Sequence, residues 1–130
     1  MPSKNYVRWF REIGMQDVPL VGGKTASLGE LYRAFAEAVI NVPNGFGVTA
    51  DAYRDALHEA GVVDELRRLV EGVKKDNVHD LSQRAAAARK IVYEATGPAE
   101  IRDQLGTAYR ALEKEYGKNV AVAVRSSATA

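Results

Sequence analysis

The sequence contains no cysteine, so disulfide bonds and thiolate chemistry are excluded. No apolar run approaches the roughly 18 residues that a membrane-spanning helix needs, and the first residues lack the apolar core of a signal peptide. Charge of neither sign is in excess, because 18 Lys and Arg against 17 Asp and Glu leave a net charge of +1. This balance favours neither a nucleic-acid partner nor a membrane surface. We therefore expect a cytoplasmic protein.

Histidine is also scarce, and the two that occur are His58 and His79. Both fall on expected helices at exposed positions, with no cluster of acidic side chains that would complete a metal site. A lone histidine can act as a base, but a surface position is the simpler interpretation of each. We expect no metal ligand among these residues.

The chain of 130 residues is long enough for one domain, which would bury about two thirds of its unfolded surface. Short β-branched or alternating segments predict strands at 6–10, 46–48 and 120–124. Apolar residues at helical spacing predict five helices. They are expected at about 25–38, 50–60, 66–73, 78–95 and 98–116. The fold class is therefore α+β and rich in helix, with the helices between 49 and 117 forming one cluster.

Helix starts carry recognisable capping residues. Thr49 is expected to cap the second helix. Ser27 with Glu30 could form a capping box at the first helix, and Asp80 with Gln83 at the fourth.

The stretch 21–31, which reads VGGKTASLGEL, holds the strongest local signal for a binding site. Gly22 and Gly23 allow a sharp turn and close approach of a ligand, and an apolar-periodic helix follows directly. The first turn of a helix has unpaired N–H groups and the positive end of its dipole, and Lys24 adds a full charge there. These features predict a site for a phosphate or a carboxylate.

A P-loop does not explain this stretch. Gly23, Lys24 and Thr25 match the end of the motif, but its first glycine is replaced by Val18 and Pro19 interrupts the loop.

The chain ends with a second candidate segment, 120–130, which reads VAVAVRSSATA. Arg125 follows the expected strand, and Ser126 and Ser127 come next, where ligand-facing residues are common. A guanidinium matches phosphate oxygens bidentately. The two serines could donate hydroxyl groups to a ligand or only shape the turn.

Three motifs together resemble the N-terminal nucleotide-binding region of the phosphoenolpyruvate synthase and pyruvate phosphate dikinase family. They are VGGK-x-ASLGE at 21–30, VP-x-GF-x-VT at 42–49, and V-x-VRSSA at 122–128, in the family's order. The opening segments, YVRWF at 6–10 and GM-x-DVPL at 14–20, most resemble phosphoenolpyruvate synthases. The resemblance covers nearly the whole chain. Asn44 departs from it, because the family usually has a second proline there.

This resemblance implies that residues 1–130 are the N-terminal part of an ATP-grasp-like domain. It implies that Lys24 and Arg125 hold the phosphates of ATP, with Gly22, Gly23, Ser126 and Ser127 as possible lining of the site. Catalytic residues and the ligands of Mg²⁺ would lie outside this chain. In the family, ATP phosphorylates a histidine on a mobile domain, and pyruvate becomes phosphoenolpyruvate on a further domain, with AMP and phosphate as the other products.

The sequence stops inside the last family motif, so we expect a fragment that binds ATP weakly or not at all and does not turn over. Two alternatives remain open. The first is the same ATP module in a rifampicin phosphotransferase. The second is a non-catalytic interaction module that associates through exposed apolar surface.

Overall fold

The computed structural model describes residues 4–74 and 76–129, which form two compact units. The terminal unit joins the N-terminal residues up to Ala52 with the chain from Glu100 onward. The middle unit comprises Tyr53–Ala99. Each unit has its own packing and is described by itself.

The terminal unit contains a small antiparallel sheet of strands β1 (Val7–Trp9) and β2 (Phe46–Val48). Arg8 lies opposite Gly47 in this pairing, and Trp9 lies opposite Phe46. The rings of Trp9 and Phe46 meet edge to face, with centroids 5.4 Å apart, so this cross-strand pair stabilises the two short strands. Both strands confirm the sequence prediction.

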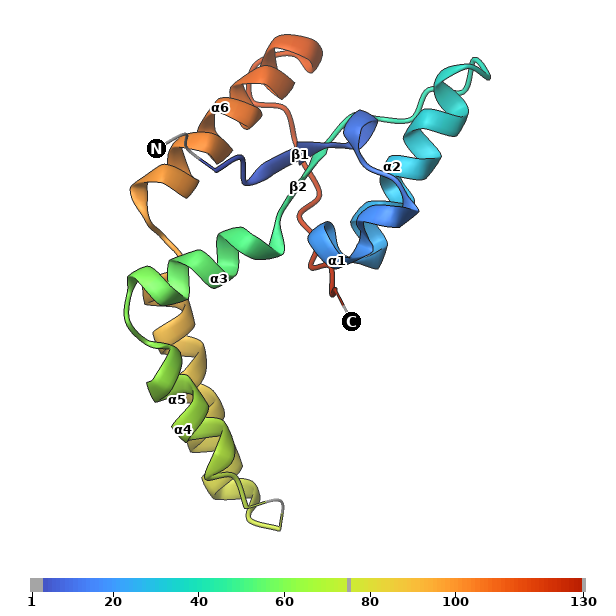
Figure 1. Ribbon diagram of the computed structural model, residues 1–130. Coiled ribbons are helices and arrows are strands. Elements are labelled where there is room, and N and C mark those ends of the chain that lie inside the picture. The colour runs from blue at the N-terminus through green and yellow to red at the C-terminus, as the bar shows by residue number, and fades with distance from the viewer. Residues whose placement is uncertain (1–3, 75, 130) are drawn as a thin grey trace. The chain divides into compact units, whose positions relative to one another are not determined.

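Helical segments lie on both faces of this sheet (Figure 1). After β1 come two 3₁₀ turns, η1 (Phe10–Glu12) and η2 (Met15–Asp17), and then helices α1 (Val18–Val21) and α2 (Gly23–Ala36). On one face, the start of α2 reaches β2, since a Cβ at Gly47 would overlap the Thr25 methyl group. On the other face, Trp9 and helix α6 (Ala99–Tyr116) line a groove of about 260 Å³.

The core beneath α2 centres on Ile13, which is 1% exposed and packs with Val21 and Ala26. Helix α2 comes close to this side chain because Gly29 has none of its own. A Cβ at Gly29 would lie 2.6 Å from the Ile13 carbonyl oxygen and 2.8 Å from its Cβ. The glycine therefore sets how closely α2 packs on the segment before it.

Helix α6 from Glu100 onward belongs to the terminal unit, whereas α4 and α5 belong to the middle unit, which corrects the prediction of one helical cluster over 49–117. Its Gln104 side chain accepts a hydrogen bond from the N–H of Tyr6 at 2.8 Å and donates to the carbonyl of Lys4 at 2.7 Å. Ile101, Ala108 and Leu112 of α6 are buried. Periodicity shows that such a face is buried, but not which segment covers it.

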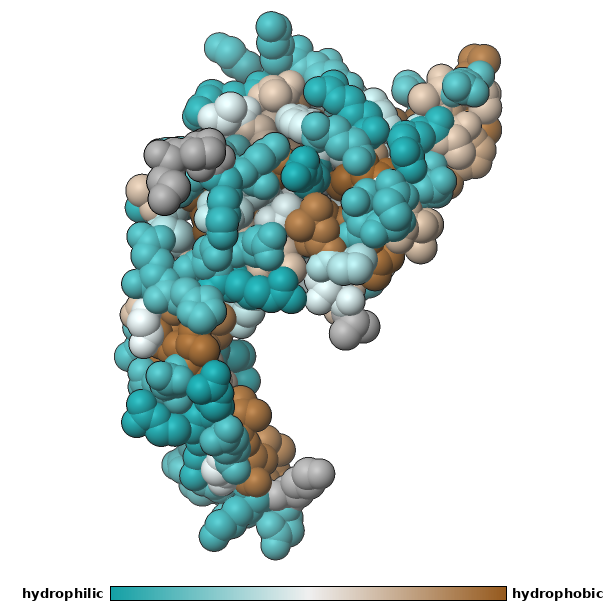
Figure 2. Space-filling model, in the orientation of Figure 1, coloured by the Kyte–Doolittle hydropathy of each residue, from teal (hydrophilic) through white to brown (hydrophobic). Residues whose placement is uncertain are grey.

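The middle unit holds most of α3 (Ala50–Glu59) and an antiparallel hairpin of α4 (Val63–Glu71) and α5 (Val78–Ala95). Arg84 joins the two hairpin helices, since its Nε lies 2.9 Å from the Asp80 carboxylate and its Nη1 donates to the Leu69 carbonyl at 3.3 Å. No described residue of α4 or α5 is fully buried. Figure 2 accordingly shows apolar surface along the hairpin. Val70 of α4 is 67% exposed.

The predicted helix-rich α+β class is confirmed, and the five expected helices begin and end within a few residues of the expected bounds, whereas the short α1 was not expected. Among the described residues, no helix has both the length and the apolar character that crossing a bilayer requires.

The predicted strand at 120–124 is wrong, because the segment has no pairing partner among the described residues. Val122 is 49% exposed and Val124 is 91% exposed. Alternating valine and alanine suit a strand, but a strand forms only where another backbone supplies the hydrogen bonds.

Of the three capping predictions, one is confirmed and two are wrong. The Thr49 hydroxyl accepts from the N–H of Ala52 at 3.3 Å, so this cap is confirmed. Helix α5 is capped by Asn77, whose Oδ1 accepts from the N–H of Asp80 at 3.0 Å, and not by the pair Asp80 and Gln83.

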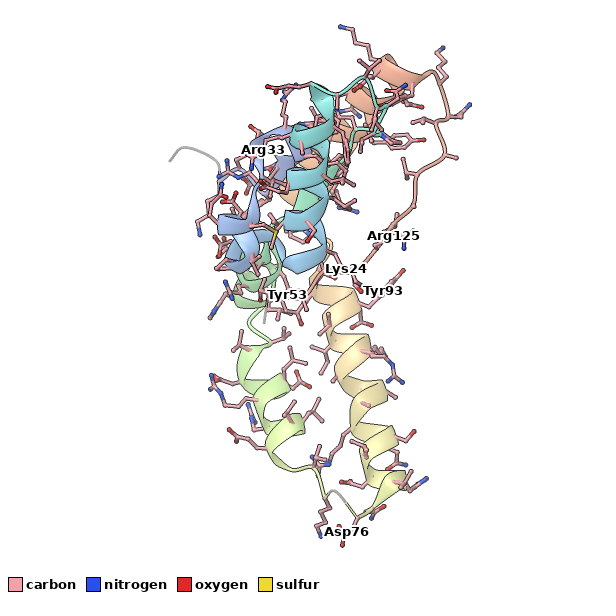
Figure 3. The ribbon with its side chains drawn as sticks, turned by 90° about the vertical axis from the view of Figure 1, so that its right-hand side faces the viewer. Lys24, Arg33, Tyr53, Asp76, Tyr93 and Arg125 are labelled. Atoms are coloured by element: carbon pink, nitrogen blue, oxygen red, sulfur yellow. The ribbon has the colours of Figure 1, made fainter. Side chains whose placement is uncertain are left out.

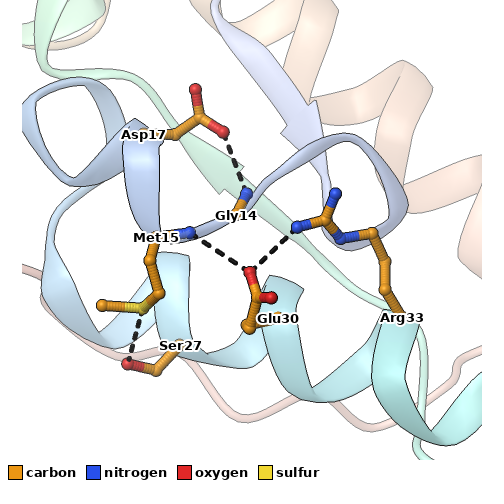
Figure 4. A network of polar contacts seen from close by, with 6 residues as sticks. All are labelled: Gly14, Met15, Asp17, Ser27, Glu30 and Arg33. Carbon is orange, nitrogen blue, oxygen red and sulfur yellow. Dashed lines mark hydrogen bonds and ion pairs between the residues drawn. The ribbon is translucent and has the colours of Figure 1, made fainter.

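The expected box of Ser27 and Glu30 is also wrong, because α2 begins at Gly23 and both residues lie inside the helix. They instead hold the preceding loop (Figure 4). The Glu30 carboxylate accepts from the N–H of Met15 at 3.3 Å and pairs with Arg33 at 2.9 Å. The Ser27 hydroxyl donates to the Met15 sulfur at 3.8 Å. These contacts fasten η2 to α2 just before the glycine turn.

Candidate functional site

The turn between α1 and α2 is built on Gly22, whose φ is +82° and ψ is 163°. This region of backbone space is essentially restricted to glycine. The N–H of Gly22 donates to the Val18 carbonyl at 2.9 Å, and its carbonyl accepts from Ala26 at 3.0 Å. The turn therefore closes α1 and opens α2 at one residue, with Lys24 in the first turn of α2.

The last described segment of the chain lies against this turn. The N–H of Gly23 donates to the Ala128 carbonyl at 3.0 Å, and the N–H of Thr25 donates to the Ser127 hydroxyl at 3.2 Å. We call these two bonds, with Gly22 beneath them, the clasp. Thr25 and Ser127 are 102 positions apart in the sequence. The clasp thus brings together the two segments that carry the candidate site residues.

Close approach gives Gly22 a second reason to be glycine. A Cβ there would overlap the Ser127 hydroxyl and lie 2.7 Å from the Ser127 carbonyl carbon and 2.8 Å from the Ala128 oxygen. A Cβ at Gly23 would meet no atom within 4 Å. The first glycine is therefore required by the clasp on steric grounds, whereas the second is not.

The clasp changes how this helix start can receive an anion. Two N–H groups expected to be free for a ligand, those of Gly23 and Thr25, are bound to the chain itself. The dipole of α2 still favours negative charge near its start. An anion at this helix start would therefore be bound mainly by cationic side chains and less by backbone N–H groups.

Lys24 and Arg125 are both exposed, and they lie on the two segments that the clasp joins (Figure 3). Arg125 comes two residues before Ser127, so the chain places its Cα within about 7 Å of the Ser127 Cα. Ser126 between them is exposed as well. The structure thus brings the predicted phosphate-binding cations to one part of the terminal unit.

Arg8 is a further cation of the terminal unit, and it was not predicted as a site residue. It lies opposite Gly47, so both residues point to the sheet face that Thr25 contacts. Its Nε is buried and has no hydrogen-bond partner in the described part of the chain. The signal that could have found it is its alternation with Val7 and Trp9, which face α6.

Magnesium, which the family resemblance implies, prefers oxygen ligands, usually from carboxylates. Residues 4–74 and 76–129 contain no group of three His, Cys, Asp or Glu side chains that could hold a metal ion. His58 on α3 and His79 on α5 are exposed. We therefore assign none of the described residues to a metal.

The family model described as the pyruvate phosphate dikinase AMP/ATP-binding domain matches residues 18–130. The chain belongs to this family of nucleotide-binding domains.

Several curated relatives are named phosphoenolpyruvate synthase. The protein from Pseudomonas aeruginosa is 42% identical, over 96% of this chain and 16% of its own length. The protein from Synechocystis is 40% identical, over 95% of this chain and 16% of its own length. The protein from Aquifex aeolicus is 37% identical, over 98% of this chain and 15% of its own length. The chain thus spans about a sixth of the length of the relatives it matches.

Proposed function

We propose that this chain supplies the phosphate-binding side of the ATP site in a phosphoenolpyruvate synthase-like phosphotransferase. The observation that carries the proposal is the clasp, because it joins the segment of Lys24 to the segment of Arg125. Membership of an AMP/ATP-binding family supports a nucleotide as the ligand.

In this proposal the two cations have different tasks. The Lys24 ammonium is a compact charge that neutralises phosphate oxygens, and the Arg125 guanidinium fixes their orientation through paired hydrogen bonds. Gly22, Gly23, Ser126 and Ser127 line the same place. Phosphoryl transfer depends mainly on positioning and charge neutralisation, so these residues would contribute without forming a covalent bond.

The wider reaction is proposed from the names of the relatives. ATP, pyruvate and water would give phosphoenolpyruvate, AMP and phosphate in the cytoplasm, through a phosphohistidine on another domain. Mg²⁺, held by residues outside 1–130, would neutralise phosphate charge. Because residues 1–130 span about a sixth of the length of the relatives, we expect no turnover by these residues alone.

Ligand-detected ³¹P NMR at low ionic strength tests the proposal with ATP and with inorganic tripolyphosphate. Two charge-assisted contacts of about 1.5–3 kcal/mol each correspond to a dissociation constant on the order of 1 mM. Both ligands should bind, and Lys24→Ala or Arg125→Ala should each weaken binding about tenfold. Lys118→Ala and Arg89→Ala, at other exposed positions, are the matched controls. If the control substitutions lowered the affinity for these ligands equally, binding would be due to nonspecific charge attraction, and the proposal would be contradicted.

The rifampicin phosphotransferase alternative uses the same nucleotide module. The relatives reported above are named phosphoenolpyruvate synthases, and for that reason we propose pyruvate as the acceptor. Their identities of 37–42% extend over nearly all of this chain.

The segment 120–124, which is exposed from Ala121 to Val124, favours a second candidate function, self-association of a non-catalytic module. Its sequence, VAVAV, is palindromic. Antiparallel pairing of two copies about Val122 would place valine opposite valine and alanine opposite alanine, with Arg125 opposite Asn119 and no like charges facing each other. Size-exclusion chromatography with light scattering should then show a dimer that Val122→Lys dissociates. A monomer at high concentration would refute this candidate.

A further inference from the structure

We propose that Ser127 is a positioning residue of the nucleotide site, which caps helix α2 from the far end of the chain and thereby sets the relation between Lys24 and Arg125. The inference rests on the proposed function and assigns a role within it. Ser127 would act through these two cations and not by contact with the phosphates.

The first step is the capping geometry. Helix α2 has no side-chain cap of its own, because Gly22 occupies the N-cap position. An N-cap side chain normally accepts a hydrogen bond from the second or third residue of the helix. Here the third residue, Thr25, donates to the Ser127 hydroxyl at 3.2 Å. Ser127 therefore acts as the N-cap of α2, although it lies 102 positions after Thr25 in the sequence.

The second step is the confinement of Lys24. The residues on both sides of it, Gly23 and Thr25, donate their N–H groups to Ala128 and Ser127. The backbone of Lys24 is thus held between two bonds to the last described segment. Since Arg125 precedes Ser127 by two residues, the same bonds limit how far its backbone can move from that of Lys24.

The third step is the orientation of the Ser127 hydroxyl. Its oxygen accepts from Thr25, and the place that a Cβ would fill at Gly22 is occupied by this hydroxyl. A residue packed so closely against the turn is suited to fixing backbones in place. Ser82, an exposed serine on α5 that has no part in the proposed site, provides the control.

The test combines Ser127→Ala with Lys24→Ala in a double-mutant cycle, with Ser82→Ala as the control. Thr25 amide exchange reports the clasp, ³¹P NMR reports ATP affinity, and thermal unfolding reports the fold. Ser127→Ala should speed exchange at Thr25 and weaken ATP binding about fivefold, as expected for loss of a helix cap. In the Lys24→Ala background the same change should have little further effect on affinity, because the side chain to be positioned is gone.

The outcomes separate this inference from the proposed function. If Ser127→Ala speeds Thr25 exchange but leaves ATP affinity unchanged while Lys24→Ala lowers it, the positioning role is overturned and the ATP site stands. If the two substitutions add fully, Ser127 acts independently of Lys24 and the inference is again overturned. If the wild-type chain binds no ATP, both fail, and slow exchange at Thr25 would show that the clasp exists without a nucleotide role.

Discussion

Replacing Gly22 with alanine should damage the clasp, whereas the same replacement at Gly23 should not. Gly22 has φ +82° and ψ 163°, a conformation that costs a non-glycine residue about 1–3 kcal/mol. Its new Cβ would also overlap Ser127, and such overpacking typically costs about 1–3 kcal/mol. The two contributions sum to about 2–6 kcal/mol. The Ser127 segment can relieve part of the overlap by moving away. We therefore expect Gly22→Ala to lower the free energy of unfolding by about 2–3 kcal/mol in total.

Urea unfolding of Gly22→Ala, Gly23→Ala and wild type measures the global effect, and amide exchange at Thr25 measures release of the Ser127 segment. Gly22→Ala should lose stability, protection at Thr25, or both. Gly23→Ala should keep both within about 1 kcal/mol, since a Cβ there meets no atom within 4 Å and alanine favours a helix more than glycine. Equal stability and equal Thr25 protection in the two variants would refute the steric argument for the clasp.

Two further pairs of substitutions test the packing and capping described above. Gly29→Ala should lower the free energy of unfolding by about 1–3 kcal/mol, because its Cβ would meet the Ile13 backbone. The control Gly106→Ala should be neutral or stabilising in the same urea titration, because its Cβ would meet only a flexible arginine side chain at 3.3 Å. Asn77→Ala should destabilise helix α5 by about 1 kcal/mol, measured as faster amide exchange in its first turn. Gln83→Ala should leave that exchange unchanged. Faster exchange in Gln83→Ala and unchanged exchange in Asn77→Ala would instead support the box of Asp80 and Gln83.

Local features of the sequence predicted the elements well. The helix at 78–95 was found with its observed bounds, because its apolar spacing is regular and Gly97 and Pro98 follow it. Strands β1 and β2 were found because β-branched and aromatic residues stand between turn residues. For the helix the deciding interactions lie within a few residues of one another, whereas each of the two strands also needs the other as its hydrogen-bonding partner.

Features that depend on distant partners were not predictable. The segment 120–124 has the alternation of a strand, but no described backbone pairs with it. Helix α6 was expected to form one cluster with the other helices, whereas it belongs to the terminal unit, where Gln104 accepts a hydrogen bond from Tyr6. Sequence spacing reports which face of an element is apolar, and the choice of partner is made by the whole chain.

The candidate site falls between these cases. Lys24 and Arg125 could be singled out by residue type and family motif, but their proximity depends on the bond from Thr25 to Ser127, which no spacing rule reveals. Likewise, the sequence motif gives no reason to distinguish Gly22 from Gly23. The positive φ and the close contacts at Gly22 distinguish them in the structure. Arg8 was passed over because its relation to the site depends on strand register.

The most direct test of the central claim is a ¹H–¹⁵N NMR titration with Mg-ATP of wild type, Lys24→Ala and Lys118→Ala. Saturable shifts confined to residues 22–27 and 125–128, retained in Lys118→Ala and lost in Lys24→Ala, are the predicted result. A well-dispersed wild-type spectrum that does not change with ATP at tenfold the expected dissociation constant, itself on the order of 1 mM, would contradict the account.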